Sequence, residues 1–252
     1  MLTSPACNGL NYYNAQMLLL SLIVGLAGGL VVNYLADVLP ATRSLAKPDW
    51  WPVSGKSLKE YFSRTRVLIV FVVALAITDL VNRNPPIGFP SYLFLFVLAY
   101  FLLVTVIDIE HRVVMHPVSI VGALLMGGIG FWRHGAVSTV IGGAVGFGFM
   151  LALFYLGDLL GRLMAKIRKE SWEQTALGFG DVNLAGVIGL LMGWPGVIGA
   201  LFFGMLAAGV FSAGYLLVTI ANRKYRAFTS IPYAPFLCLG TVAVVVASVY
   251  LT

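Results

Sequence analysis

Long apolar runs are the feature that most constrains this chain of 252 residues. A helix needs roughly 20 apolar residues to cross the ~30 Å hydrocarbon core of a bilayer, with about 17–25 as the usual range. Eight runs meet or approach that length: 17–39, 67–81, 90–107, 118–132, 137–157, 181–193, 196–220 and 233–251. Because backbone polar groups must be satisfied within lipid, we expect an all-α, polytopic membrane bundle of about eight transmembrane helices.

The composition agrees with a membrane protein. Hydrophobic residues make up 60% of the chain and charged residues 10%, whereas soluble domains average about 25% charged residues. In a soluble protein the net charge of +6 would suggest a nucleic-acid partner, but in membrane proteins Lys and Arg gather in cytoplasmic loops. We therefore expect the lipid bilayer as a partner and no nucleic acid.

The basic residues alternate between loops as a correct span count requires. Fourteen of the 16 Lys and Arg residues lie in every second loop, namely 40–66, 108–117, 158–180 and 221–232. The positive-inside rule then predicts that these loops face the cytoplasm and that both termini lie outside. The expected location is the inner (cytoplasmic) membrane, with a multi-pass topology.

Glycines spaced four residues apart recur inside the spans, as Gly25 with Gly29 and Gly142 with Gly146. In lipid, such steps allow helix backbones to approach closely. They predict helix contacts and say nothing about chemistry.

Ionisable residues beside a span are costly in lipid, so they mark candidate functional sites. Asp108 directly follows an apolar run, and Asp181 begins another run within Gly178-Phe-Gly-Asp181. Span parity and charge counting place both carboxylates at the cytoplasmic membrane face. Three further acids near span ends are interpreted as interfacial: Asp37, Asp79 and Asp158.

Each of the two aspartates also has a purely structural interpretation. Asp108 could be a polar helix terminus. Asp181 could be an N-cap or first-turn acid that accepts bonds from free N–H groups and complements the helix dipole. The preceding glycines favour function, because glycine permits close approach of another backbone. Gly178 and Gly180 could let an extended peptide lie against the carboxylate.

Two aspartates that share a site provide hydrolytic chemistry without a metal. They cannot easily both ionise, so the pair holds one proton between them. The ionised member can act as a base toward water, and the protonated member can donate to a scissile carbonyl. Asp108 and Asp181 are therefore the candidate catalytic pair.

The surroundings of Asp108 leave a metal site open as an alternative. His111 and His116 flank it, and with Asp108 and Glu110 they could bind a metal ion, although the segment lacks a second ligand cluster and a metal site needs defined geometry. Cys7 and Cys238 form no C-x-x-C pattern. We expect no metal, and we expect Glu110 to tune the pair or to face water.

Three segments together resemble the type IV prepilin leader peptidases, the GxGD class of membrane aspartyl proteases. The segments are 105–112 around Asp108, 177–184 around Asp181 with Gly193-Trp194 after it, and Ile231-Pro-Tyr-Ala-Pro-Phe236. Their order and spacing fit that family over roughly residues 90–251, with a fainter echo at 33–40.

The resemblance implies that Asp108 and Asp181 are the catalytic acids. Residues 90–252 would form the aspartyl peptidase membrane domain, and residues 1–89 would hold N-terminal spans with a basic, Cys-free loop. The substrate would be the basic leader of a type IV prepilin or pseudopilin, cut at the cytoplasmic face after a glycine. This would connect the chain to type IV pili and protein secretion. Bacterial members often also methylate the new N-terminus with S-adenosylmethionine.

The chain departs from the common family pattern at three positions. Many members carry Pro followed by Asp or Asn about seven residues after the first catalytic aspartate, where this chain has Met115 and His116. Asn183 stands where Lys is frequent, so His116 and Asn183 could tune the pair. Loop 40–66 is short and has no cysteine, which argues against zinc and against methyl transfer.

Two other functions stay open on the sequence. A divergent homologue could bind pilin-like partners without cleaving them, given the departures just described. A proton-coupled transporter would also use membrane carboxylates, but it predicts acids near mid-span and broken helices around a midplane site.

Overall fold

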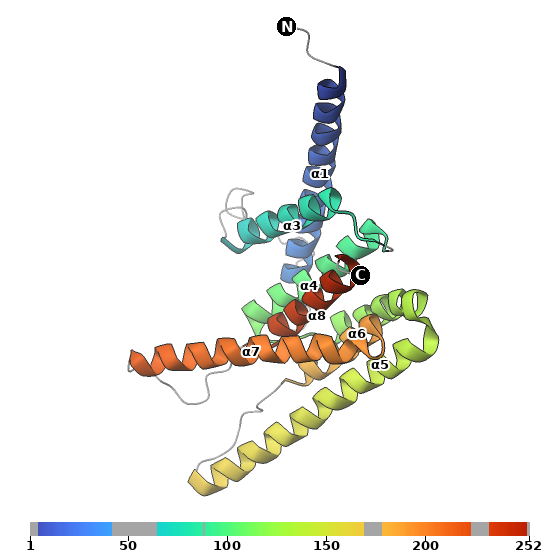
Figure 1. Cartoon of the computed structure of the whole chain (residues 1–252). Helices are drawn as coiled ribbons and strands as arrows, with labels where there is room; N and C mark the ends of the chain where they lie inside the picture. Colours follow the sequence, from blue (N-terminus) through green and yellow to red (C-terminus); the bar gives the residue numbers. More distant parts are fainter. Residues whose placement is uncertain (1–4, 42–64, 88, 169–177, 223–231, 251–252) are drawn as a thin grey trace. The chain divides into compact units, whose positions relative to one another are not determined.

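The computed structural model describes residues 5–41, 65–87, 89–168, 178–222 and 232–250 (Figure 1). Over these ranges the regular structure is entirely helical. The helices are α1 (Pro5–Ala41), α3 (Thr65–Arg83), α4 (Ser91–His111), α5 (His116–Arg168), α6 (Phe179–Met192), α7 (Gly196–Ala221) and α8 (Ala234–Tyr250). Most of two basic loops predicted to be cytoplasmic, 40–66 and 221–232, lies outside the described residues. In the third, 158–180, residues 158–168 continue helix α5 and residues 169–177 lie outside the described residues.

Every predicted span overlaps a helix, and two of them, 118–132 and 137–157, fall within α5. Gly135 interrupts that helix with φ 78° and ψ 168°. A residue with a Cβ adopts such a positive φ only at a cost, so the glycine permits the chain to turn back. Residues 116–134 are called the first limb of α5 below, and residues 136–168 the second limb.

Within the described chain, five helices are long and apolar enough to cross a bilayer, namely α1, α3, α4, α5 and α7. Helix α6 has 14 residues and rises about 21 Å at 1.5 Å per residue, less than the ~30 Å hydrocarbon core. The expected class, an all-α, multi-pass membrane protein, is confirmed. The count of eight crossings and the outside location of the termini stay predictions.

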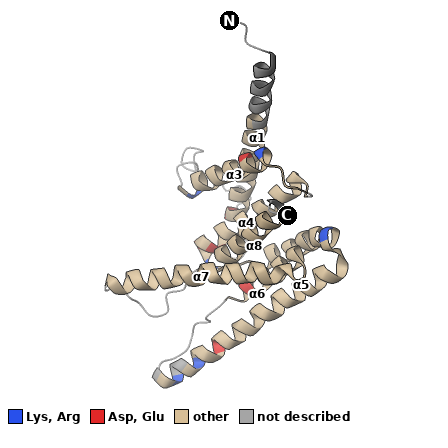
Figure 2. Ribbon diagram, viewed as in Figure 1, with Lys and Arg blue, Asp and Glu red and all other residues tan. Residues whose placement is uncertain are grey.

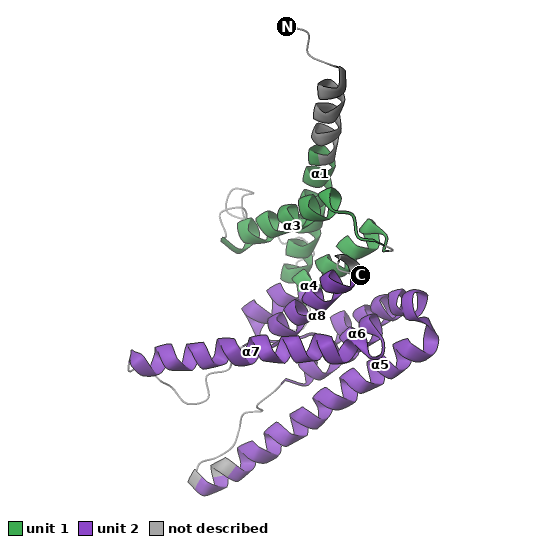
Figure 3. Cartoon of the chain, viewed as in Figure 1, with its two compact units in different colours: residues 1–103 green, residues 104–252 purple. Residues whose placement is uncertain are grey.

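The chain divides into two compact units, residues 1–103 and 104–252 (Figure 3). The division falls inside α4, so the end of this helix belongs to the second unit together with α5 to α8. A functional domain boundary at 89/90 stays a prediction. Both candidate aspartates lie in the second unit.

Helices α1 and α3 pack together in the first unit through glycine. A Cβ on Gly25 would lie 3.0 Å from the Cα of Leu75, and a Cβ on Gly29 would lie 2.7 Å from the ring of Phe71. These two glycines are the four-residue step noted in the sequence, and its prediction of a close helix contact is confirmed.

Charged residues are sparse on the described helices and lie mainly near the helix ends (Figure 2). The three acids interpreted as interfacial each pair with an arginine: Asp37 with Arg66 at 2.7 Å, Asp79 with Arg83 at 2.8 Å and Asp158 with Arg162 at 2.8 Å. The Asp37–Arg66 pair joins the end of α1 to the start of α3. The ion pairs thus explain how these three acids are stabilised near the helix ends.

Helix α6 contacts both limbs of α5 in the second unit. On the second limb, a Cβ on Gly142 would meet the carbonyl oxygen of Gly189, and a Cβ on Gly146 would meet that of Ala185. On the first limb, a Cβ on Gly130 would meet the carbonyl oxygen of Leu190. The backbone of α5 therefore packs directly on the backbone of α6, because these glycines carry no side chain that would separate the two helices.

Replacing Gly189 by Ala is expected to destabilise the second unit. The new Cβ would meet the Gly142 carbonyl oxygen, and overpacking of this kind typically costs about 1–3 kcal/mol. The apparent Tm in detergent should fall by several degrees. Gly148→Ala is the matched control because a Cβ there meets nothing within 4 Å. Equal Tm values for the two variants would contradict this packing.

Candidate active site

Asp108 lies in the last turn of α4, and its side chain reaches the start of another helix. The residue is 4% exposed. Its Oδ2 accepts a hydrogen bond from the backbone N–H of Ala234, the first residue of α8, at 3.1 Å. The first amides of a helix have no partner within that helix, and a carboxylate there also complements the helix dipole. Asp108 therefore caps α8 from a distant part of the sequence.

Helix α4 ends at His111 because the next residue, Arg112, adopts a left-handed conformation, with φ 52°. The Arg112 N–H donates to the carbonyl oxygen of Asp108 at 2.8 Å, which is the αL form of helix C-cap. Glycine is usual at such a position, so the backbone of an arginine there is locally strained. The turn brings the chain to the start of α5 within four residues.

Asp181 is the third residue of α6 and is 8% exposed. Its N–H donates to the carbonyl oxygen of Gly178, the N-cap, at 3.0 Å. The first-turn interpretation of Asp181 is therefore correct as a description of its place. Its carboxylate also interacts electrostatically with that of Asp108, so a position in the first turn does not separate it from the other acid.

The two glycines before Asp181 have different neighbours. A Cβ on Gly178 would lie 3.3 Å from Oδ2 of Asp181, so this glycine leaves room for the carboxylate. A Cβ on Gly180 would lie 2.7 Å from both the Cβ and the carbonyl oxygen of Val114. The backbone that approaches Gly180 is thus the chain's own connection between α4 and α5. Gly180 joins the segment that follows Asp108 to the helix that carries Asp181.

The third sequence segment meets the same two acids at the start of α8. Beyond the Ala234 N–H, Tyr233 interacts electrostatically with Asp181. One helical turn after Ala234, Cys238 interacts electrostatically with both aspartates and hydrogen bonds with Thr105. The structure therefore brings together the ends of α4, α6 and α8 around the two carboxylates.

Sequence reasoning missed Thr105, Tyr233 and Cys238 as neighbours of the aspartates. Thr105 lies three residues before Asp108, and Cys238 lies four residues after Ala234. Residues three and four apart share a helix face, so this spacing could have identified both once the two helix ends were known to meet. For Tyr233, the sequence offered only its place within the segment 231–236.

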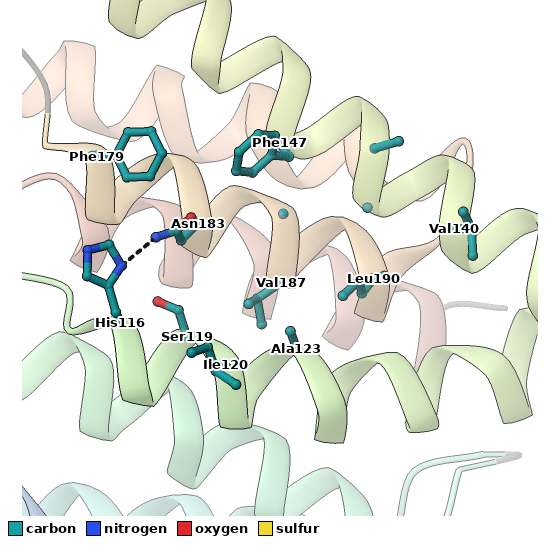
Figure 4. A pocket seen from close by; sticks show the side chains of 13 residues that line it. His116, Ser119, Ile120, Ala123, Val140, Phe147, Phe179, Asn183, Val187 and Leu190 are labelled. Atoms are coloured by element: carbon teal, nitrogen blue, oxygen red, sulfur yellow. Dashed lines mark hydrogen bonds between the residues drawn. The ribbon is translucent and has the colours of Figure 1, made fainter.

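His116 and Asn183 form a second polar pair, away from the face that carries Asp181. The amide Nδ2 of Asn183 lies 3.0 Å from Nδ1 of His116 (Figure 4). Asn183 follows Asp181 by two residues, which rotates its direction by about 200° around α6. The pair lines a cavity of about 600 Å³ between α6 and the two limbs of α5. Any effect of His116 and Asn183 on the two aspartates would therefore have to be transmitted through α6.

Glu110 lies at the end of α4, where its side chain is 31% exposed. Its Oε2 is 3.9 Å from Nε2 of His111. The structure thus places Glu110 beside His111 and leaves its proposed tuning role untested. Within the described residues, no three His, Cys, Asp or Glu side chains lie close enough together to hold a metal ion.

These helices and their buried acids define a multi-pass membrane protein with a carboxylate pair at helix ends. Residues 93–213 match the model of the type IV leader peptidase family, and the chain is similar to that family over this segment. The family suggested by the residues around Asp108 and Asp181 is confirmed, since the matched segment contains both. The comparisons found no similar curated protein and no similar solved structure.

Proposed function

We propose that this protein is an aspartyl endopeptidase that removes the leader of type IV prepilin or pseudopilin precursors at the cytoplasmic face of the inner membrane. The observation that carries the proposal is that two buried aspartates, at the end of α4 and in the first turn of α6, interact electrostatically. Similarity to a peptidase family supports hydrolysis. The two carboxylates supply the acid and the base that hydrolysis requires.

The proposed reaction follows the behaviour of two carboxyl groups that share one proton. The ionised aspartate takes a proton from a water molecule as the water oxygen attacks the scissile carbonyl carbon. The protonated aspartate gives its proton to the carbonyl oxygen, which yields a tetrahedral diol. When the C–N bond breaks, a proton passes to the departing amine and the other product is the leader's carboxylate. The pair then holds one proton again, and no metal or covalent intermediate is needed.

The contact between Asp108 and α8 fixes one oxygen of the proposed pair. Oδ2 accepts a hydrogen bond from the Ala234 N–H, which leaves its second lone pair and both lone pairs of Oδ1 for water or the substrate. A group held within about 0.5 Å of its productive position is what catalysis by proton transfer demands. In this proposal α8 positions Asp108, and the first turn of α6 positions Asp181.

The test is cleavage of a purified prepilin by the purified protein in proteoliposomes, followed by mass spectrometry of both products. A cut directly after the leader glycine that is lost in both Asp108→Asn and Asp181→Asn would support the proposal. Precursor binding without cleavage by the unaltered protein would instead identify the non-cleaving homologue. Ion uptake that depends on the two acids, without cleavage, would identify a transporter.

Ala234→Pro is expected to slow cleavage by about 10- to 100-fold. Proline is well accepted in the first turn of a helix, but it lacks the N–H that donates to Asp108. Hydrogen bonds to charged groups are worth about 1.5–3 kcal/mol, which corresponds to that range of rates. The measurement is kcat for precursor cleavage, with the Tm recorded in parallel.

The control for this substitution is Ala234→Val, because position 234 is fully buried and both variants add volume there. Valine keeps the N–H and should retain most of the activity that proline removes. Equal kcat values for the two variants would show that volume matters at this position and that the hydrogen bond does not.

A further inference from the structure

The cavity between α6 and the two limbs of α5 has a polar end and an apolar end (Figure 4). His116, Ser119 and Asn183 supply the polar atoms, near the first residues of α5 and α6. The remaining lining is apolar and consists of Ile120, Ala123, Val140, Gly143, Ala144, Phe147, Phe179, Gly186, Val187 and Leu190. A cavity with so few polar partners is a poor site for water, which needs two to four of them.

The dimensions of the cavity limit what can enter it. Its lining runs along α6 from Phe179 to Leu190, which is roughly 16 Å at 1.5 Å per residue. A volume of about 600 Å³ over that length gives room for a single extended chain.

The cavity is open to its surroundings along one side. Val140 is 64% exposed and Phe147 is 37% exposed, although both line it. In a multi-pass membrane protein, the surroundings of an exposed valine within an apolar helix are lipid. A chain can therefore enter sideways from the bilayer.

The polar end offers a defined set of hydrogen-bonding groups. An amide nitrogen can only donate, so Nδ1 of His116 accepts from Asn183. The ring proton of a neutral His116 is then on Nε2. This leaves one donor, Nε2–H, and one acceptor, Oδ1 of Asn183, for a polar head group. Ser119 uses its hydroxyl on the carbonyl oxygen of Met115 at 3.2 Å.

We propose that this cavity binds one acyl chain of a membrane glycerophospholipid, with the head-group oxygens at His116 and Asn183. The order of polar and apolar lining matches that of a lipid in the bilayer, because the polar end lies at helix starts and the apolar end lies further along the helices. The bound chain contacts the face of α6 opposite Asp181. The lipid site is independent of the proposed peptidase activity and is measured without it.

The experiment uses photo-crosslinking of the unaltered protein in phosphatidylcholine nanodiscs. The probe is phosphatidylglycerol with a diazirine on one acyl chain, placed either close to the ester or at the methyl end. The first probe should label residues near 116–123, and the second should label residues near Val140 and Leu190. Labelling of these peptides should saturate at low probe fraction, whereas labelling of outer helix faces should rise in proportion to the probe.

Filling the cavity gives the second measurement. Ala123→Phe places a ring among the lining residues and should lower saturable labelling by at least about tenfold. Ala213→Phe is the matched control, because Ala213 is an exposed alanine on α7 that does not line the cavity. Labelling that never saturates, or that has the same pattern for both diazirine positions, would overturn the proposal. Saturable labelling displaced by a prepilin peptide at equal lipid content would assign the cavity to the substrate instead.

Discussion

Asp181→Asn is expected to lower kcat for precursor cleavage by about 10³-fold, the loss that follows removal of a general acid or base. Asparagine has nearly the same shape as aspartate and can still accept hydrogen bonds, so the fold of α6 should persist. It cannot take a proton from water or give one to a carbonyl oxygen. The Tm of the variant should therefore stay near that of the unaltered protein while cleavage disappears.

The same argument applies to Asp108, where a structural role must be separated from a chemical one. Asp108→Asn keeps an oxygen that can accept the Ala234 N–H, whereas Asp108→Ala removes it. Both variants should lose cleavage, and only the alanine variant should also lose stability, by about 1–3 kcal/mol for a buried donor left without a partner. Full activity of the asparagine variant would show that Asp108 has only a structural role, as a cap for α8.

An exposed acid serves as the control for both aspartates. Glu110→Gln alters a carboxylate two residues from Asp108 whose side chain is 31% exposed. We expect a change in kcat of no more than a few-fold. A loss as large as that of Asp181→Asn would require Glu110 to take part in the chemistry, and the assignment of the pair would have to be revised.

Gly180→Ala should reduce cleavage by about 100-fold although it adds a single methyl group. Its Cβ would lie 2.7 Å from the carbonyl oxygen of Val114 and 3.2 Å from its Cα. Backbone atoms cannot rotate away as a side chain can, so the connection between α4 and α5 has to move. That connection follows Asp108 directly, and a displacement of about 1 Å at a catalytic group can cost about 100-fold in rate.

Gly128→Ala is the matched control for this prediction. Gly128 lies in the first limb of α5, and a Cβ there meets nothing within 4 Å. Alanine is a better helix former than glycine by roughly 0.5–1 kcal/mol, so the control should be as stable as the unaltered protein or slightly more so, with unchanged cleavage. If both alanine variants cleave equally well, Gly180 does not hold the two segments in place.

Much of the candidate site could be predicted from the sequence because ionisable residues are costly in lipid and therefore rare in or beside the spans. Apolar runs of helix length predicted all of the described helices, and the charges at their ends reduced the candidate acids to a few. The glycine steps at Gly25–Gly29 and Gly142–Gly146 predicted close helix contacts, and both occur. The glycines before Asp181 predict room for a substrate peptide, and the structure shows that the backbone of Val114 packs against Gly180.

The sequence by itself determined where the helices lie and which two acids are costly to place at a membrane, because both follow from local hydrophobicity. Only the tertiary structure decided that Asp108 caps α8, that Asp181 interacts with Asp108, and that Asn183 turns toward His116 instead. Helices in lipid are apolar on nearly every face, so their hydrophobic pattern does not indicate which face meets which neighbour. That choice rests on backbone contacts between residues far apart in the chain.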